Sequence, residues 1–272
     1  MQQSRARPIG VFDSGVGGLT VLRSLREVLP AQDFIYLGDT ARLPYGTKSA
    51  ETVSRYSLQC AEALLERGIG CLVVACNTAS AFALGALSQR YPSLPVIGVI
   101  EAGANAAVGA SRSQHIAVIA TEGTIGGGAY QAAIRLRNPA ARVTTCACSM
   151  FVALAEEGWT RGPVVEAIAR RYLDPIFFAE DPPDTLVLGC THFPVLADAI
   201  RAVLPAQVSI VDSAATTAAA LLRQISPAGT APLTRDGRVT WLATDDARRF
   251  ARVGGRFLGE TLHAESVEII DL

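Results

Sequence analysis

The chain has 272 residues, of which 50% are apolar and 18% are charged, and its formal net charge is −1. This composition supports sizeable buried cores and argues against a largely disordered chain, and the near-neutral charge gives no electrostatic reason to expect nucleic acid as a partner. The sequence does not open with a basic segment followed by an apolar run, and no apolar run is long enough to span a membrane, so we expect a cytoplasmic protein without a membrane partner.

The cysteine, histidine and lysine content limits the cofactor chemistry. Without a secretory signal, the six cysteines are expected to be reduced thiols. The only close cysteine pair is Cys146-x-Cys148, and the three histidines are scattered without zinc-ligand spacing, so no metal is expected. A pyridoxal-phosphate enzyme needs a Schiff-base lysine, and the only lysine, Lys48, lies in a turn-like stretch before a helix, where a solvated side chain is the simpler interpretation.

The first hundred residues alternate between predicted strands and helices. Apolar runs bounded by turn residues predict strands at 9–12, 34–37, 71–75 and 96–99. Helical periodicity predicts helices at about 19–29, 49–67 and 78–90. This alternation is typical of parallel βαβ units.

The pattern then starts again, which predicts two pseudo-equivalent units. Strands are expected at 116–120, near 142–145 and at 186–189, with a helix after residues 121–124 and further helices at about 151–157 and 163–178. Residues 209–212 look like a return to the first unit. The tail is expected to contain a helix, a loop rich in Pro and Gly at 226–237, a strand at 239–243, a helix and a strand at 267–271.

The predicted fold class is therefore α/β. We expect two pseudo-symmetric domains, each with a central, mostly parallel sheet flanked by helices, and an active site in the cleft between them. The predicted boundaries are residues 1–98 plus 212–272 for the first domain and 99–211 for the second.

Two short apolar runs each end on a cysteine, and they share one pattern. Leu72–Thr78 and Leu186–His192 both contain three aliphatic residues, a small residue, a cysteine and then polar side chains. Such runs are typical of buried parallel strands, and ligands of open α/β sheets bind at the carboxyl ends of strands. Cys76 and Cys190 are thus expected to reach one site from two sides, an arrangement that suits an acid and a base that can exchange roles.

The residues around these thiols fit an anionic substrate. Each cysteine is expected near a helix N-terminus, which favours the thiolate by lowering a pKa of about 8.5. Asn77, Thr78 and Thr191 supply hydrogen-bond donors, and His192 could assist proton movement. The other four cysteines are expected to pack as small apolar side chains, and they are Cys60, Cys71, Cys146 and Cys148.

The glycine-rich segment 15–18 precedes a predicted helix and invites a phosphate-binding interpretation. Its spacing matches neither the dinucleotide fingerprint nor the phosphate loop of nucleotide hydrolases, and the same geometry would hold a carboxylate. Asp13 beside it is a candidate acid/base partner, and its alternative role is to cap the following helix.

Two other mechanisms use the same residues less economically. A cysteine hydrolase would explain Cys190 and His192 but would leave Cys76 without a role. A dithiol redox protein usually presents a C-x-x-C motif, whereas Cys76 and Cys190 are far apart in the sequence.

At these motifs the chain resembles glutamate racemases, within the aspartate/glutamate racemase superfamily. The matching segments span about three quarters of the chain and are IGVFDSGVGGLTVL (9–22), YLGDTARLPYGTKS (36–49), VVACNTASA (73–81), GVIEAGANAA (98–107), VIATEGTI (118–125), LGCTHFPVL (188–196) and VDSA (211–214). The resemblance implies a cofactor-independent enzyme in which one cysteine removes the α-proton of glutamate and the other reprotonates the opposite face.

The resemblance also assigns roles to individual residues. Cys76 and Cys190 would be the two thiols, assisted by Asp13 and His192 respectively. The family's glutamate near the second cysteine best matches Glu156, with Glu157 as its competitor, because Ser149 and Ala153 stand where prolines are common. The implied substrate contacts are Asp13, Ser14, Tyr45, Gly46, Asn77, Thr78, Thr121, Thr124, Thr191 and His192.

The expected function is racemisation of glutamate by a two-base mechanism, supplying D-glutamate for peptidoglycan, in an enzyme that the family suggests is a homodimer. The alternatives are a sister enzyme acting on aspartate, hydantoins or arylmalonates, or an inhibitory protein-binding role.

Overall fold

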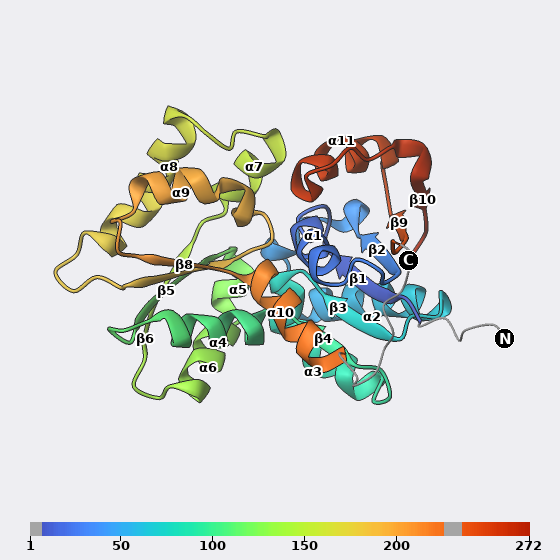
Figure 1. The fold of residues 1–272 in the computed structure, drawn as a ribbon, viewed down its shortest axis with the longest axis horizontal. Helices are drawn as coiled ribbons and strands as arrows, with labels where there is room; N and C mark the ends of the chain where they lie inside the picture. Colours follow the sequence, from blue (N-terminus) through green and yellow to red (C-terminus); the bar gives the residue numbers. More distant parts are fainter. Residues whose placement is uncertain (1–6, 226–235) are drawn as a thin grey trace.

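The computed structural model describes residues 7–225 and 236–272, which form two parallel sheets flanked by helices (Figure 1). No helix in these two ranges is long and apolar enough to cross a membrane. The two sheets lie in different halves of the molecule, as the sequence pattern predicted.

The first sheet has six strands in the order β10-β9-β2-β1-β3-β4. The strands are β1 (Ile9–Asp13), β2 (Phe34–Gly38), β3 (Cys71–Val74), β4 (Val96–Gly98), β9 (Val239–Ala243) and β10 (Val267–Ile269). The helices connected to them are α1 (Leu19–Val28), α2 (Ala50–Glu66), α3 (Asn77–Arg90) and α11 (Ala247–Leu258), with short 3-10 turns η1 (Thr40–Arg42), η2 (Tyr45–Thr47) and η4 (Ala264–Ser266).

The second sheet has four strands in the order β6-β5-β7-β8. The strands are β5 (His115–Ala120), β6 (Arg142–Ala147), β7 (Thr185–Gly189) and β8 (Ser209–Asp212). The helices of this half are α4 (Ile100–Ala110), α5 (Glu122–Gly126), α6 (Ala129–Arg137), α7 (Met150–Glu157), α8 (Pro163–Phe177), α9 (Ala197–Val203) and α10 (Ser213–Ile225), with a 3-10 turn η3 (Phe193–Leu196).

The internal repeat is confirmed by the strand order. Strands β2-β1-β3-β4 of the first sheet and β6-β5-β7-β8 of the second follow the same sequence of neighbours, and every pairing is parallel. In each sheet the chain first adds a strand on one side of the starting strand (β2 beside β1, β6 beside β5) and then adds the next strands on the other side (β3 and β4, β7 and β8). The direction of the connections therefore reverses between β1 and β3, and between β5 and β7. A crevice at the carboxyl ends of strands forms at such a reversal, which is where α/β sheets bind ligands.

One predicted connection was wrong. Residues 209–212 do not return to the first sheet, because they form β8 and pair with β7, with Ser209 opposite Thr185. The chain completes the fourth strand of the second sheet before α10 carries it back, packed against both α1 and α4. The return therefore begins with a helix and not with a strand.

Two further details were not predicted. Helix α4 carries mostly small residues and buries Gly103, Ala104 and Ala107, so it lacks the large apolar stripe by which helices are recognised. The single helix expected after residue 121 is divided into α5 and α6 at Gly128, which adopts a left-handed conformation with φ 67°. The loop predicted at 226–237 lies outside the described residues except at its last two positions.

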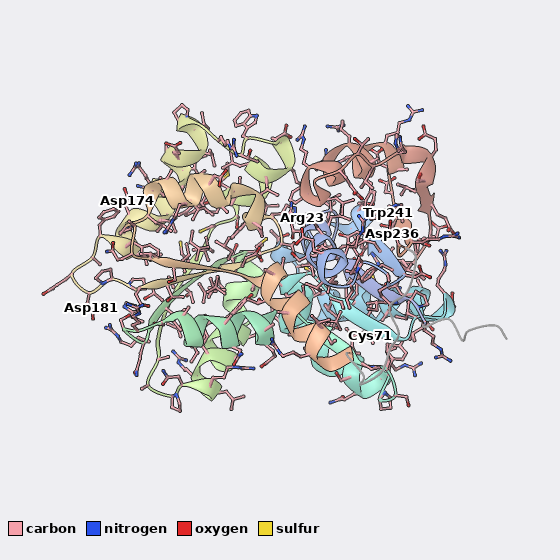
Figure 2. The ribbon with its side chains drawn as sticks, viewed as in Figure 1. Arg23, Cys71, Asp174, Asp181, Asp236 and Trp241 are labelled. Atoms are coloured by element: carbon pink, nitrogen blue, oxygen red, sulfur yellow. The ribbon has the colours of Figure 1, made fainter. Side chains whose placement is uncertain are left out.

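The buried strands explain why the site residues are held firmly. Every residue of β1, β3 and β7 is buried, as expected for strands covered on both faces. Cys71 and Cys76 lie at opposite ends of the β3 segment, and Figure 2 labels Cys71 in the half of the molecule that holds the first sheet. Only the carboxyl end of the strand reaches the reversal point.

Candidate active site

The carboxyl ends of β1, β3 and β7 bring the predicted catalytic residues together. Asp13 is the last residue of β1, and Cys76 and Cys190 follow β3 and β7 at equivalent places in the repeat. All three are buried, with 0%, 5% and 6% of their surface exposed. Ser14, next to Asp13 in the chain, contacts Cys76, and Thr191, next to Cys190, donates to Asp13, so the three groups lie in one region.

Cys76 is tied to the start of α3. Its Sγ accepts a hydrogen bond from the backbone N–H of Ala79 at 3.4 Å and lies 3.6 Å from the hydroxyl of Ser14. The thiol thus caps the helix, where backbone N–H groups and the helix dipole favour negative charge. Ser14, expected to contact substrate, is therefore next to one of the two thiols.

The predicted lowering of the Cys76 pKa was wrong. Burial raises the pKa of the Cys76 thiol to about 12, and the negative charge of Asp13 adds to this effect. The Ala79 and Ser14 hydrogen bonds lower the pKa but do not offset the loss of solvation. In this structure Cys76 is consequently a protonated thiol, which suits a proton donor.

Cys190 has a different neighbourhood. Its Sγ lies 3.9 Å from Nδ1 of His192, and Nε2 of the same ring lies 3.1 Å from Oε1 of Glu156. Glu156, and not the exposed Glu157, faces the histidine. Cys190 is followed by the 3-10 turn η3 and not by an α-helix. The group beside its sulfur is therefore His192, whereas the group beside the Cys76 sulfur is the start of a helix.

The His192–Glu156 pair carries opposite charges. Burial lowers the pKa of His192, but the Cys190 sulfur and the Glu156 carboxylate together raise it to about 10. The hydrogen bond from His192 holds the pKa of Glu156 below its usual value, against the effect of burial. The imidazolium thus places a positive charge and a proton donor 3.9 Å from the Cys190 sulfur.

We therefore expect the stability contribution of His192 to depend on pH. Because the folded pKa is raised above the unfolded value of about 6.5, the contribution is fully present below pH 6.5 and is lost as pH rises through about 10. The difference in free energy of unfolding between the wild type and His192→Gln, measured by urea unfolding from pH 6 to 10.5, should shrink with increasing pH. A difference that stays constant or grows would contradict a charged His192.

Asp13 connects the two thiol neighbourhoods. Its Oδ2 accepts the backbone N–H of Gly15 at 2.9 Å, and its Oδ1 accepts the Thr191 hydroxyl at 3.4 Å. Burial raises the pKa of Asp13, and the positive charge of His192 opposes this. Since Thr191 follows β7, this hydrogen bond joins residues attached to the two different sheets.

The glycine-rich segment 15–18 packs closely against site residues, including two from the half that contains the second sheet. A Cβ on Gly17 would lie 2.5 Å from Nδ1 of His192 and would also contact Oγ1 of Thr191, while one on Gly18 would lie 2.5 Å from Cβ of Asp13. The glycines are thus explained by close packing against the site residues rather than by a phosphate group.

Hydroxyl groups from both halves meet at a second point. The Oγ1 atoms of Thr78, Thr121 and Thr124 lie 2.9–3.0 Å from one another, with Thr78 at the start of α3 and the other two at the start of α5. Beside them, Oδ1 of Asn77 accepts the Tyr130 hydroxyl at 2.8 Å, whereas its buried Nδ2 has no hydrogen-bond partner among the described residues. These groups offer donors to an anionic substrate.

Tyr45 and Gly46 lie on the same side of the site. A Cβ on Gly46 would lie 2.6 Å from Cβ of Thr121, so the backbone of η2 is pressed against the hydroxyl cluster. The Tyr45 hydroxyl donates its proton to the Asp39 carboxylate and is therefore already engaged. Any contact of Tyr45 with a ligand would therefore use its ring or backbone.

The remaining cysteines follow the packing prediction with one exception. Cys60, Cys71 and Cys148 are buried, whereas Cys146 is partly exposed, with its Sγ 3.8 Å from that of Cys148. Over residues 7–225 and 236–272, no group of three or more His, Cys, Asp or Glu side chains is placed to hold a metal ion.

Two residues at the site had no signal in the sequence. Tyr130 orients the amide of Asn77 from α6, and Arg249 on α11 donates to Oε2 of Glu156 at 2.8 Å. Both lie outside the recognisable motifs, and their partners are distant in the chain.

Comparison with known proteins places the geometry in context. The sequence profile described as Asp/Glu/Hydantoin racemase matches residues 9–221. The chain is 51% identical to the glutamate racemase of Geobacter metallireducens, over 94% of each chain. Among solved structures, it is similar to the glutamate racemase of Francisella tularensis in complex with D-glutamate (TM-score 0.87, 36% identity, 98% of each chain) and to that of Thermus thermophilus in complex with β-chloro-D-alanine (TM-score 0.86, 42% identity, 99% of each chain).

Proposed function

The chain belongs to the Asp/Glu/hydantoin racemase family, and we propose that it interconverts L-glutamate and D-glutamate by a two-base mechanism in which Cys76 and Cys190 exchange the α-proton. The observation that carries this proposal is the pair of thiols at equivalent strand ends, one beside Asp13 and the other beside His192. The relatives' activity on glutamate supports the choice of substrate.

The proposed step balances without a cofactor. One sulfur, as a thiolate, takes the α-proton and becomes a thiol, and the electron pair of the C–H bond passes into the α-carboxylate. The other thiol then delivers its proton to the opposite face and becomes a thiolate. The product has inverted configuration, and the two sulfurs have exchanged protonation states, so the reverse reaction begins from the other side.

The different surroundings of the thiols support a definite starting state. Cys76, with its raised pKa, begins as the proton donor, and Cys190, beside the His192 imidazolium, begins as the acceptor. When the other enantiomer is the substrate, the two cysteines act in the opposite roles. A donor and an acceptor of the same residue type keep the forward and reverse barriers similar, which an interconversion of mirror images requires.

The donors around the site support stabilisation of the carbanion. An α-proton of an amino acid is weakly acidic, so preorganised hydrogen bonds to the α-carboxylate are needed in the transition state. Nδ2 of Asn77, which has no hydrogen-bond partner in the described part of the chain, and the hydroxyls of Thr78, Thr121 and Thr124 supply such donors from both halves. A dicarboxylate with one positive ammonium group fits a site rich in hydroxyl donors.

The wider biological role is part of the same proposal. The enzyme would supply D-glutamate for peptidoglycan in the cytoplasm, where free thiols stay reduced, and would work as a homodimer. Its two domains would comprise residues 1–98 plus 212–272 and residues 99–211, with the substrate between them. The hydrogen bond from Thr191 to Asp13 supports a site shared by the two halves.

A substrate panel tests the proposed specificity. The purified protein, dialysed against a metal chelator, is incubated with L-glutamate, L-aspartate, a chiral 5-substituted hydantoin and an arylmalonate. Circular dichroism follows the loss of chirality of the first three, and release of carbon dioxide follows decarboxylation of the achiral arylmalonate. We expect loss of the L-glutamate signal with at least about a hundredfold preference in kcat/KM over aspartate, because a shorter side chain leaves carboxylate donors unpaired. Turnover of another substrate in preference to glutamate would contradict the proposal.

A further inference from the structure

Helix α11 contacts the His192–Glu156 pair from the other half of the molecule. Arg249 Nη2 donates to Oε2 of Glu156 at 2.8 Å, and Arg256 Nη1 donates to the backbone carbonyl of Glu156 at 2.9 Å. The ring of Phe257 lies edge-on to His192, with centroids 5.1 Å apart. Figure 1 shows α7 and α11 next to each other along the top of the view, one in each half of the molecule.

Glu156 needs such a partner because of its position. It lies in the last turn of α7, where the helix dipole is negative and disfavours a carboxylate. A cavity of about 140 Å³, lined by Glu156 and Arg249 among others, lies beside the pair and gives the side chain room to turn away from His192. The α7 backbone therefore does not by itself hold Oε1 against the histidine.

Arg249 and Arg256 are seven residues apart, so they lie two turns apart on the same face of α11. Arg249 donates a hydrogen bond to the carboxylate of Glu156, and Arg256 donates one to the Glu156 backbone carbonyl at the end of α7. Arg256 also packs closely there, because a Cβ on Gly158 would lie 2.7 Å from Nη1 of Arg256. Of the ion pairs among the described residues, Arg249–Glu156 is the one that joins α11 to the half containing the second sheet.

We infer that Arg249 is a positioning residue: from the opposite half, it holds the carboxylate of Glu156 against His192 and thereby supports Cys190 as a base. This inference rests on the proposed two-cysteine function and names a further residue for it. Arg249 occupies Oε2 and leaves Oε1 for the histidine, so it orients Glu156 without displacing His192. Its side chain is 46% exposed, so water screens its charge at His192, and orientation is its main effect.

The inference also links catalysis to the arrangement of the two halves. The Glu156–His192–Cys190 series is complete only when α11 lies against α7. If the halves separate to admit substrate, the contact with Arg249 is lost together with the orientation of Glu156. The second base is then fully supported only in the closed arrangement.

The test compares Arg249→Met and Arg249→Lys with Arg252→Met as the matched control. Arg252 is an exposed arginine of the same helix that makes no hydrogen bond or ion pair with any described residue. We measure kcat and KM for glutamate in both directions, and the iodoacetamide alkylation rates of Cys190 and Cys76 separately by peptide mass spectrometry. The alkylation measurement needs no turnover, so it tests Arg249 even if glutamate is not the substrate.

We expect Arg249→Met to lower kcat and the Cys190 alkylation rate by about fivefold each, with KM changed less than about twofold, as for loss of one partly exposed ion pair. Cys76 alkylation should be unchanged, Arg249→Lys should recover most of both losses, and Arg252→Met should match the wild type. A wild-type rate of Cys190 alkylation in Arg249→Met would overturn the inference. Equal slowing or acceleration at Cys76 and Cys190, with a lower melting temperature, would also overturn it by showing a general structural role.

Discussion

Replacing Cys76 or Cys190 with serine is expected to lower kcat for glutamate racemisation by about 10³–10⁴-fold in each variant, because a hydroxyl cannot replace a thiol as a general base or acid near neutral pH. Both directions of the reaction should be affected, since each thiol acts once in every turnover. The measurement is the initial rate of circular dichroism change starting from each enantiomer.

The fold should survive these substitutions. Cys76 caps α3 through its sulfur, and serine is a preferred residue at that position, so the helix start keeps its hydrogen bond to the Ala79 N–H. Cys71→Ser is the matched control, because Cys71 is the first residue of β3, at the end of the strand away from Cys76 and the site. We expect it to retain kcat within about twofold, whereas full activity in Cys76→Ser or Cys190→Ser would refute the two-base mechanism.

Gly17→Ala is expected to lower kcat by about a hundredfold, although alanine adds a single methyl group. The new Cβ would lie 2.5 Å from Nδ1 of His192 and would also contact Oγ1 of Thr191, so both side chains must move. His192 then loses its alignment with Cys190, and Thr191 loses its hydrogen bond to Asp13. Steady-state kinetics with glutamate measures the effect.

Gly85→Ala is the control for the same chemical change. Gly85 lies in the interior of α3, and a Cβ there meets nothing within 4 Å. Alanine should therefore leave kcat unchanged and stabilise the protein by about 0.5–1 kcal/mol, as for other exposed helical glycines. Wild-type activity in Gly17→Ala would show that the glycine segment does not pack against the site in solution.

The repeat and the elements that carry the thiols could be predicted from sequence because their causes are local. Strands β3 and β7 are continuous apolar runs ended by small and polar residues, and the same pattern in each half predicted matching positions for Cys76 and Cys190. Helix α4 was missed because its small residues show little amphipathic contrast, although it buries Gly103, Ala104 and Ala107.

The electrostatics of the site could not be predicted in the same way. The expectation of a lowered pKa for Cys76 followed from the nearby helix start, but the depth of burial, which reverses the shift, depends on packing between the two halves. Arg249 is about ninety residues from Glu156 in sequence, and no local pattern indicates that two helices from different halves meet there. Long-range contacts of this kind become visible only in the folded structure.

The central claim is that two different groups handle the α-proton, and an initial-rate experiment in D2O tests it most directly. L-Glutamate with protium at Cα is incubated with the enzyme in D2O and stopped at low conversion, and the α-deuterium content of the separated enantiomers is measured by mass spectrometry. The two-cysteine mechanism predicts that the D-glutamate carries deuterium while the remaining L-glutamate keeps its protium, because the proton acceptor and the proton donor lie on opposite faces. D-Glutamate that retains the original protium would show that one group moves the proton between faces, and would contradict the account.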